Sequence, residues 1–82
     1  MTVPSREGGP LGRRLESLRR RSGLSQHQLA ERSGVSVHLI QSLEQGRTGN
    51  PTLRTLVGLA AALGVTAAGL LEGLPGGPGD WP

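Results

Sequence analysis

The chain has 82 residues, with nine Arg, no Lys, no Cys and a formal net charge of +3. This length allows one small domain, and the absence of Cys excludes disulfides and thiolate metal sites. No apolar run approaches the roughly 20 residues that a membrane-spanning helix needs, and the first residues lack the apolar stretch of a secretory signal.

The two ends of the chain have the composition of unstructured segments. Residues 1–10 are polar and rich in Gly and Pro, and we expect a flexible arm there. Residues 74–82 contain three Pro and three Gly, which predicts a disordered tail. The domain is therefore expected to comprise residues 11–73.

The first helix is expected over about residues 11–22. Leu11, Leu15 and Leu18 follow one another at helical spacing and form one apolar stripe. Gly23 follows in the position where helices commonly end.

The second and third helices are each preceded by a serine. Ser25 and Gln28 form the S-x-x-Q pattern of a capping box, which predicts a helix to about residue 33. Gly34 can adopt the left-handed backbone of a tight turn. Ser36 is a suitable N-cap for a third helix that ends near Gln45.

Two further helices are expected before the tail. Thr52 is expected to cap a fourth helix that ends at Leu63, and Thr66 a short fifth helix to about Glu72. The residues expected to face inward are Leu53, Leu56, Val57, Ala60 and Leu63 in the fourth helix, and Leu70 and Leu71 in the fifth. Nothing alternates as a strand does, so the fold class is all-α with five short helices.

Residues 26–45 carry the most informative pattern, two short helices joined by a glycine turn. The segment GLSQHQLAERSGVSVHLIQSLEQG, with its neighbours from about residue 11 to residue 72, resembles the phage-repressor and Cro family, the lambda-repressor-like helix-turn-helix proteins. The resemblance implies a small transcriptional regulator, a repressor in the simplest case, that binds specific double-stranded DNA. Its recognition helix would be residues 36–45, placed in the major groove.

The resemblance also implies roles for individual residues. The expected base-reading positions are Val37, His38, Gln41 and Ser42, whose side chains can contact base edges or a thymine methyl. The expected phosphate contacts are Gln26, Arg47, Thr48, Asn50, Arg14 and Arg21. Arg19 and Glu44 match a pair that forms a structural salt bridge in the family. Gln26 serving only as a helix cap, His38 as a solvated residue and the Arg run as a solvated face stay open.

Partners follow from the same resemblance. A two-fold homodimer on an inverted DNA repeat is expected, with Leu70, Leu71 and Leu74 either at the dimer interface or in the core. No cofactor, metal or enzymatic activity is expected, and the protein is expected in the cytoplasm, associated with the nucleoid. The alternative is a protein-interaction module of the same fold, such as an antitoxin or adaptor, with the tail and Trp81 as a docking segment.

Overall fold

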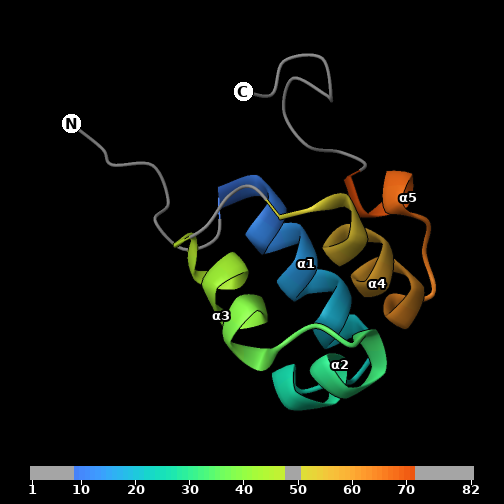
Figure 1. Ribbon diagram of the computed structural model, residues 1–82, viewed down its shortest axis with the longest axis horizontal. Coiled ribbons are helices and arrows are strands. Elements are labelled where there is room, and N and C mark those ends of the chain that lie inside the picture. Colours follow the sequence, from blue (N-terminus) through green and yellow to red (C-terminus); the bar gives the residue numbers. More distant parts are fainter. Residues whose placement is uncertain (1–8, 48–50, 72–82) are drawn as a thin grey trace.

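The computed structural model describes residues 9–47 and 51–71, and these residues form five α-helices without a strand. The helices are α1 (Gly9–Arg21), α2 (Gln26–Ser33), α3 (Val37–Gln45), α4 (Leu53–Leu63) and α5 (Ala67–Leu71). In Figure 1, α3 lies on the left, α2 at the bottom, and α4 and α5 on the right. The all-α, five-helix prediction is confirmed.

The helix starts follow the local capping signals. Ser25 accepts a hydrogen bond of 3.0 Å from the Gln28 backbone N–H, while Gln28 Oε1 accepts one of 2.8 Å from the Ser25 N–H, which completes the capping box. Ser36 and Thr52 accept from the third residue of α3 and α4 in the same way. Each cap satisfies a backbone donor that a helix leaves unpaired.

The boundary of α1 differs from the expected one. The helix begins at Gly9, ahead of the expected start at Leu11, and therefore includes Pro10. A proline in the first turn costs no hydrogen bond, because the first backbone N–H groups of a helix have no partner within it. The remaining residues of the expected flexible arm and the whole expected tail lie outside the described residues.

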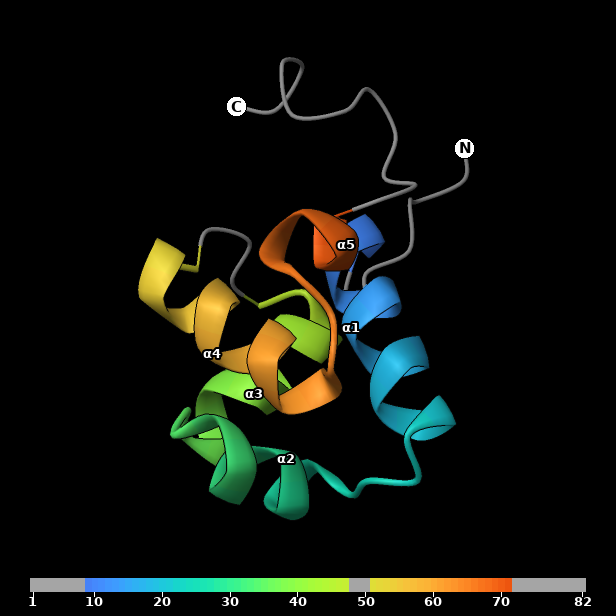
Figure 2. The ribbon, with the colours of Figure 1, turned by 90° about the vertical axis from the view of Figure 1, so that its right-hand side faces the viewer.

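The helices pack around one core, and each of them contacts two others. α1 contacts α3 and α5, α2 contacts α3 and α4, and α4 contacts α5. Figure 2 shows α5 above and α2 below, with α4 at the left-hand edge. The buried apolar side chains are Leu11, Leu15, Leu24, Leu29, Ile40, Leu43, Leu59, Ala60 and Leu70. The core thus draws on all five helices and on Leu24 in the connection between α1 and α2.

The inward face of α4 was predicted wrongly in two positions. Leu53 is 72% exposed and Val57 50% exposed, whereas Leu59, which the prediction omitted, is only 1% exposed. Leu56 and Leu63 do pack against the core. α4 is apolar from Leu56 to Leu63, so no continuous polar stripe marks its outer side, and the tertiary packing selects which apolar residues are buried.

Gly12 allows α1 to approach α3 closely. A Cβ atom at residue 12 would overlap the backbone carbonyl oxygen of Leu43 in α3. Gly58 has a similar role between α4 and α2, because a Cβ there would lie 2.9 Å from the Ser33 carbonyl oxygen. These two glycines thus permit the contacts that hold α2 and α3 against the other helices.

Within the described residues, no helix is both long and apolar enough to cross a bilayer.

Candidate nucleic-acid interface

α2 and α3 are joined by a short turn that sets their relative orientation. Gly34 ends α2 with φ of 75°, a left-handed conformation that favours glycine, and its N–H donates to the Ala30 carbonyl. Ser36 then caps α3 two residues later. Ile40 and Leu43 are buried on the inner side of α3, so the opposite side of α3 faces away from the core.

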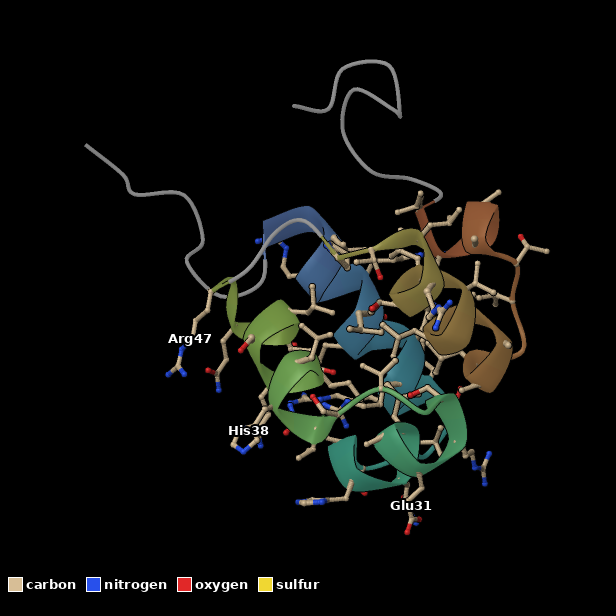
Figure 3. The ribbon with its side chains drawn as sticks, viewed as in Figure 1. Glu31, His38 and Arg47 are labelled. Carbon is tan, nitrogen blue, oxygen red and sulfur yellow. The ribbon has the colours of Figure 1, made fainter. Side chains whose placement is uncertain are left out.

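His38 is the most exposed of the four expected base-reading residues. Figure 3 shows its side chain projecting from α3 away from the body of the molecule, on the same side as Arg47. Glu31 projects from α2 in another direction, toward the bottom of the view. A polar side chain on α3 and a basic one just beyond the end of α3 therefore project to the same side of the molecule.

Val37, Gln41 and Ser42, the other three expected base-reading residues, are half-buried. The helical repeat of 100° per residue puts Gln41 and Ser42 on the same side of α3 as His38. Gln45 shares that side and is exposed, but it was not among the expected site residues. Its position seven residues after His38 is the sequence signal that would have identified it.

Arg47 is placed by the end of α3. The N–H of Gly46 donates to the Leu43 carbonyl, and the N–H of Arg47 donates to the Ser42 carbonyl at 2.9 Å. This pair of bonds is the Schellman motif, with Gly46 in the left-handed conformation that it requires. The motif fixes the backbone of Arg47 and leaves its side chain exposed.

Arg19 and Glu44 join α1 to α3 through a buried ion pair. Arg19 Nε lies 2.8 Å from Glu44 Oε2, and Arg19 Nη2 lies 3.0 Å from Glu44 Oε1. The remaining Nη1 donates to the Leu24 carbonyl at 2.8 Å, so Arg19 also holds the connection between α1 and α2. The structure therefore brings together the two residues that the sequence analysis pairs.

The pKa of Arg19 is raised above its ordinary value. The hydrogen bond to the Glu44 carboxylate is the main cause, and the charge of Glu44 and that of Glu16 add to it. Burial acts in the opposite direction, because it disfavours the charged form. The guanidinium therefore stays charged, and the ion pair persists.

Gln26 extends this pair to α2. Its Nε2 donates a hydrogen bond of 2.9 Å to Glu44 Oε1. Since an amide nitrogen carries two N–H groups, one of them remains for a ligand. Ser25, and not Gln26, supplies the cap of α2. The alternative in which Gln26 serves only as a helix cap therefore does not describe its position in the structure.

The other expected phosphate contacts divide into three groups. Arg21 is exposed at the end of α1. Arg14 is half-buried and donates through Nη2 to the Gly69 carbonyl at 3.1 Å, an engagement with α5 that favours a packing role over a phosphate contact. Thr48 and Asn50 lie outside the described residues.

Two short helices joined by a glycine turn, with one helix presenting a polar outer face, define a helix-turn-helix domain. A family model described as a helix-turn-helix domain matches residues 10–72, and the chain belongs to that family.

Curated relatives are similar over the same region. The chain is 44% identical over 61 residues to the HTH-type transcriptional regulator DdrOP3 of Deinococcus deserti, covering 74% of this chain and 46% of the relative. It is 48% identical over 56 residues to the uncharacterized HTH-type transcriptional regulator y4dJ of Sinorhizobium fredii, covering 68% and 71%. The chain thus spans about half the length of DdrOP3 and a larger share of y4dJ.

A solved structure extends the likeness to three dimensions. The structure of SinR, the master regulator for biofilm formation, in complex with DNA superposes with a TM-score of 0.72 at 32% identity, covering 76% of this chain and 98% of that chain. SinR is also among the curated relatives, from Bacillus subtilis.

Proposed function

We propose that this protein is a small transcriptional regulator, acting as a repressor, that binds specific double-stranded DNA with α3 in the major groove. The observation that carries the proposal is that exposed His38 on α3 and exposed Arg47 just beyond the end of α3 project to the same side (Figure 3). An α-helix fits the width of the major groove, and side chains on its outer face can reach base edges there.

The relatives support this proposal. DdrOP3 and y4dJ are both named transcriptional regulators, and the SinR chain that this protein resembles was solved with DNA. The same comparison supports a binding role without catalysis, in agreement with the expectation that the chain is not an enzyme. A protein of this kind would be found on the nucleoid in the cytoplasm.

The base-reading set in this proposal comprises His38, Gln41, Ser42 and Gln45, with Val37 at its edge. An imidazole can donate to or accept from a purine, an amide can bond adenine through two atoms, and a serine hydroxyl can donate to or accept from a base. Gln41 and Ser42 are half-buried, so they would contact bases only after α3 has entered the groove deeply. His38 and Gln45 would therefore make the longest-reaching contacts.

The phosphate contacts would position α3 without reading sequence. Gln26 stands at the first position of α2, where the backbone N–H groups of the helix also favour an anion. Its second amide N–H would bind a phosphate while the first holds Glu44. Arg47 and Arg21 would add charge-assisted contacts to phosphates. Thr48 and Asn50 are proposed as phosphate contacts on the basis of the resemblance alone.

The experiment that tests the proposal is selection of duplexes from a randomised DNA pool by the purified protein, followed by sequencing. A single helix-turn-helix unit reads few base pairs, so an inverted repeat with half-sites about one helical turn apart is the expected product. A folded protein that enriches no sequence at low salt would refute sequence-specific binding, and a single enriched half-site would refute the homodimer.

A further inference from the structure

Val37 is an apolar residue at the start of α3 that does not pack against the core. It is the first residue of the helix, directly after the N-cap Ser36, and it is half-buried. Among the described residues, the partly buried apolar side chains that pack against the core include Val35 and Leu39 but not Val37. The core therefore does not account for an apolar side chain at this position.

The place of Val37 on α3 brings it to the same side as the polar residues of that helix. The helical repeat puts it on one flank of the outward face, one turn before Gln41. Exposed His38 follows it directly and projects away from the body of the molecule (Figure 3). Side chains of a helix tilt toward its N-terminus, and the N-terminal part of a recognition helix is the part that contacts base edges.

We propose that Val37 makes DNA binding depend on the C5-methyl group of a pyrimidine, so that thymine or C5-methylated cytosine is favoured over uracil or unmethylated cytosine at one position of the binding site. This inference rests on the proposed function and adds the chemical group that is recognised. The base edges in the major groove present hydrogen-bond donors and acceptors, and the C5-methyl of thymine is the apolar group among them. Methylated cytosine carries the same methyl group on the same carbon.

The chemistry of valine favours the methyl group and disfavours a polar edge. Removing one methyl-sized apolar group from water corresponds to about a fourfold gain in affinity. Valine has neither a donor nor an acceptor in its side chain, so a polar base edge placed against Val37 would lose its hydrogen bond to water without a replacement. Methylation of a cytosine at this position would therefore strengthen binding.

The other side chains on the outward side of α3 recognise hydrogen-bonding groups. They are His38, Gln41, Ser42 and Gln45. Thymine and uracil present the same donors and acceptors and differ only in the methyl group. Replacing thymine by uracil therefore leaves the hydrogen bonds of these four residues unchanged, and it isolates the contact of Val37.

The test uses the duplex that selection from a randomised pool enriches. Each thymine is replaced in turn by deoxyuridine and each cytosine by C5-methylcytosine, and the affinity is measured at one fixed salt concentration, because DNA affinity depends on salt. At one position, loss of the methyl group should weaken binding about fourfold, and C5-methylcytosine should bind there more tightly than cytosine by the same factor.

The failure of this inference differs from the failure of the proposed function. Affinity that does not change with the methyl group at any pyrimidine would overturn the role of Val37 while DNA binding stands. A protein that enriches no duplex would refute the proposed function, and this inference with it.

Two variants show which residue recognises the methyl group. In Val37→Ser, which lacks the two methyl groups of valine, the ratio of thymine to uracil affinity at the sensitive position should fall from about four to about one. In the matched control His38→Ala, binding should weaken while the ratio stays at about four. A ratio that persists in Val37→Ser, or that is lost in His38→Ala instead, would overturn the assignment.

A purely structural role of Val37 gives a different result. It would lower the affinity of Val37→Ser for both duplexes equally and leave the ratio as in wild type. Circular dichroism shows whether Val37→Ser is folded. If it is not, Val37→Thr keeps the shape of the side chain and one of its two methyl groups, and its ratio should be lower than that of wild type.

Discussion

Gln26 and Glu44 are joined by a hydrogen bond of 2.9 Å between the amide nitrogen of one and the carboxylate of the other. The bond connects the first residue of α2 with the last turn of α3. Because Arg19 holds the same carboxylate from α1, three helices meet at one buried charge. The position of α3 therefore depends on the Glu44 carboxylate, which is buried and lies away from the outward face of α3.

Removing the cation should destabilise the domain strongly. Arg19→Met leaves Glu44 buried without its main partner, and we expect the free energy of unfolding to fall by about 3–5 kcal/mol. Urea denaturation followed by circular dichroism measures this. The control is Arg20→Met, whose side chain is 70% exposed in its pair with Glu16 and should cost at most about 1 kcal/mol. Equal losses of unfolding free energy in the two variants would contradict the structural role of Arg19. If Arg19→Met alone is unfolded, the double variant Arg19→Met/Glu44→Leu should regain stability, because it leaves no unpaired buried charge.

The stability that Arg19 gives the fold through its pair with Glu44 should not depend on pH in the ordinary range. The pKa of Arg19 is raised by its hydrogen bond to Glu44. A group whose pKa is higher in the folded state stabilises the fold at every pH below its unfolded value, and the effect is lost only as the pH rises through the folded value. We therefore expect the stability difference between wild type and Arg19→Met/Glu44→Leu, which leaves no unpaired carboxylate, to stay constant from about pH 6 to about pH 9. A difference that shrinks toward pH 9 would show that Arg19 titrates there.

Gly12→Ala should destabilise the protein, contrary to helix propensity. Alanine usually stabilises a helix interior by about 0.5–1 kcal/mol relative to glycine. Here its Cβ would overlap the Leu43 carbonyl oxygen, and overpacking of this kind costs about 1–3 kcal/mol. The midpoint of thermal unfolding should fall, while Ser17→Ala on the exposed side of α1 should leave it unchanged or raise it. An increase for Gly12→Ala would mean that α1 and α3 lie farther apart.

Arg47→Ala should weaken DNA binding equally for all sequences. If Arg47 neutralises one phosphate, its loss should reduce the slope of log affinity against log salt by about 1. Arg20→Ala removes the same charge from a side chain that pairs with Glu16 on α1, and its slope should match that of wild type. Identical slopes for all three proteins would remove Arg47 from the interface.

His38→Ala should change which sequence is preferred. The loss should be confined to one base position in each half-site and amount to about 1–3 kcal/mol there. Binding of His38→Ala to a panel of single-base operator variants measures it, and His27→Ala, an exposed histidine at the start of α2, is the matched control. A uniform loss at all positions would instead indicate a phosphate contact.

The helix boundaries could be predicted closely because their signals are local. Ser25, Ser36 and Thr52 cap the helices that the sequence analysis assigns to them, and Gly34 adopts the left-handed turn. A cap involves residues three apart in the chain, so its hydrogen bonds do not depend on the rest of the fold. The all-α class, the helix-turn-helix and the Arg19–Glu44 pair were therefore within reach of the sequence, the last through the resemblance.

The tertiary structure alone decided which faces are used. α4 is apolar almost throughout, so its sequence could not show that Leu59 is buried and that Leu53 and Val57 are exposed. Likewise, the Arg run of α1 did not reveal that Arg14 binds the Gly69 carbonyl while Arg21 stays exposed. These outcomes depend on which helix packs against each side chain. Such a contact can join residues 55 positions apart in the chain, as it does for Arg14 and Gly69. Local sequence determined where the helices begin and end, and long-range packing determined what each of them presents to a partner.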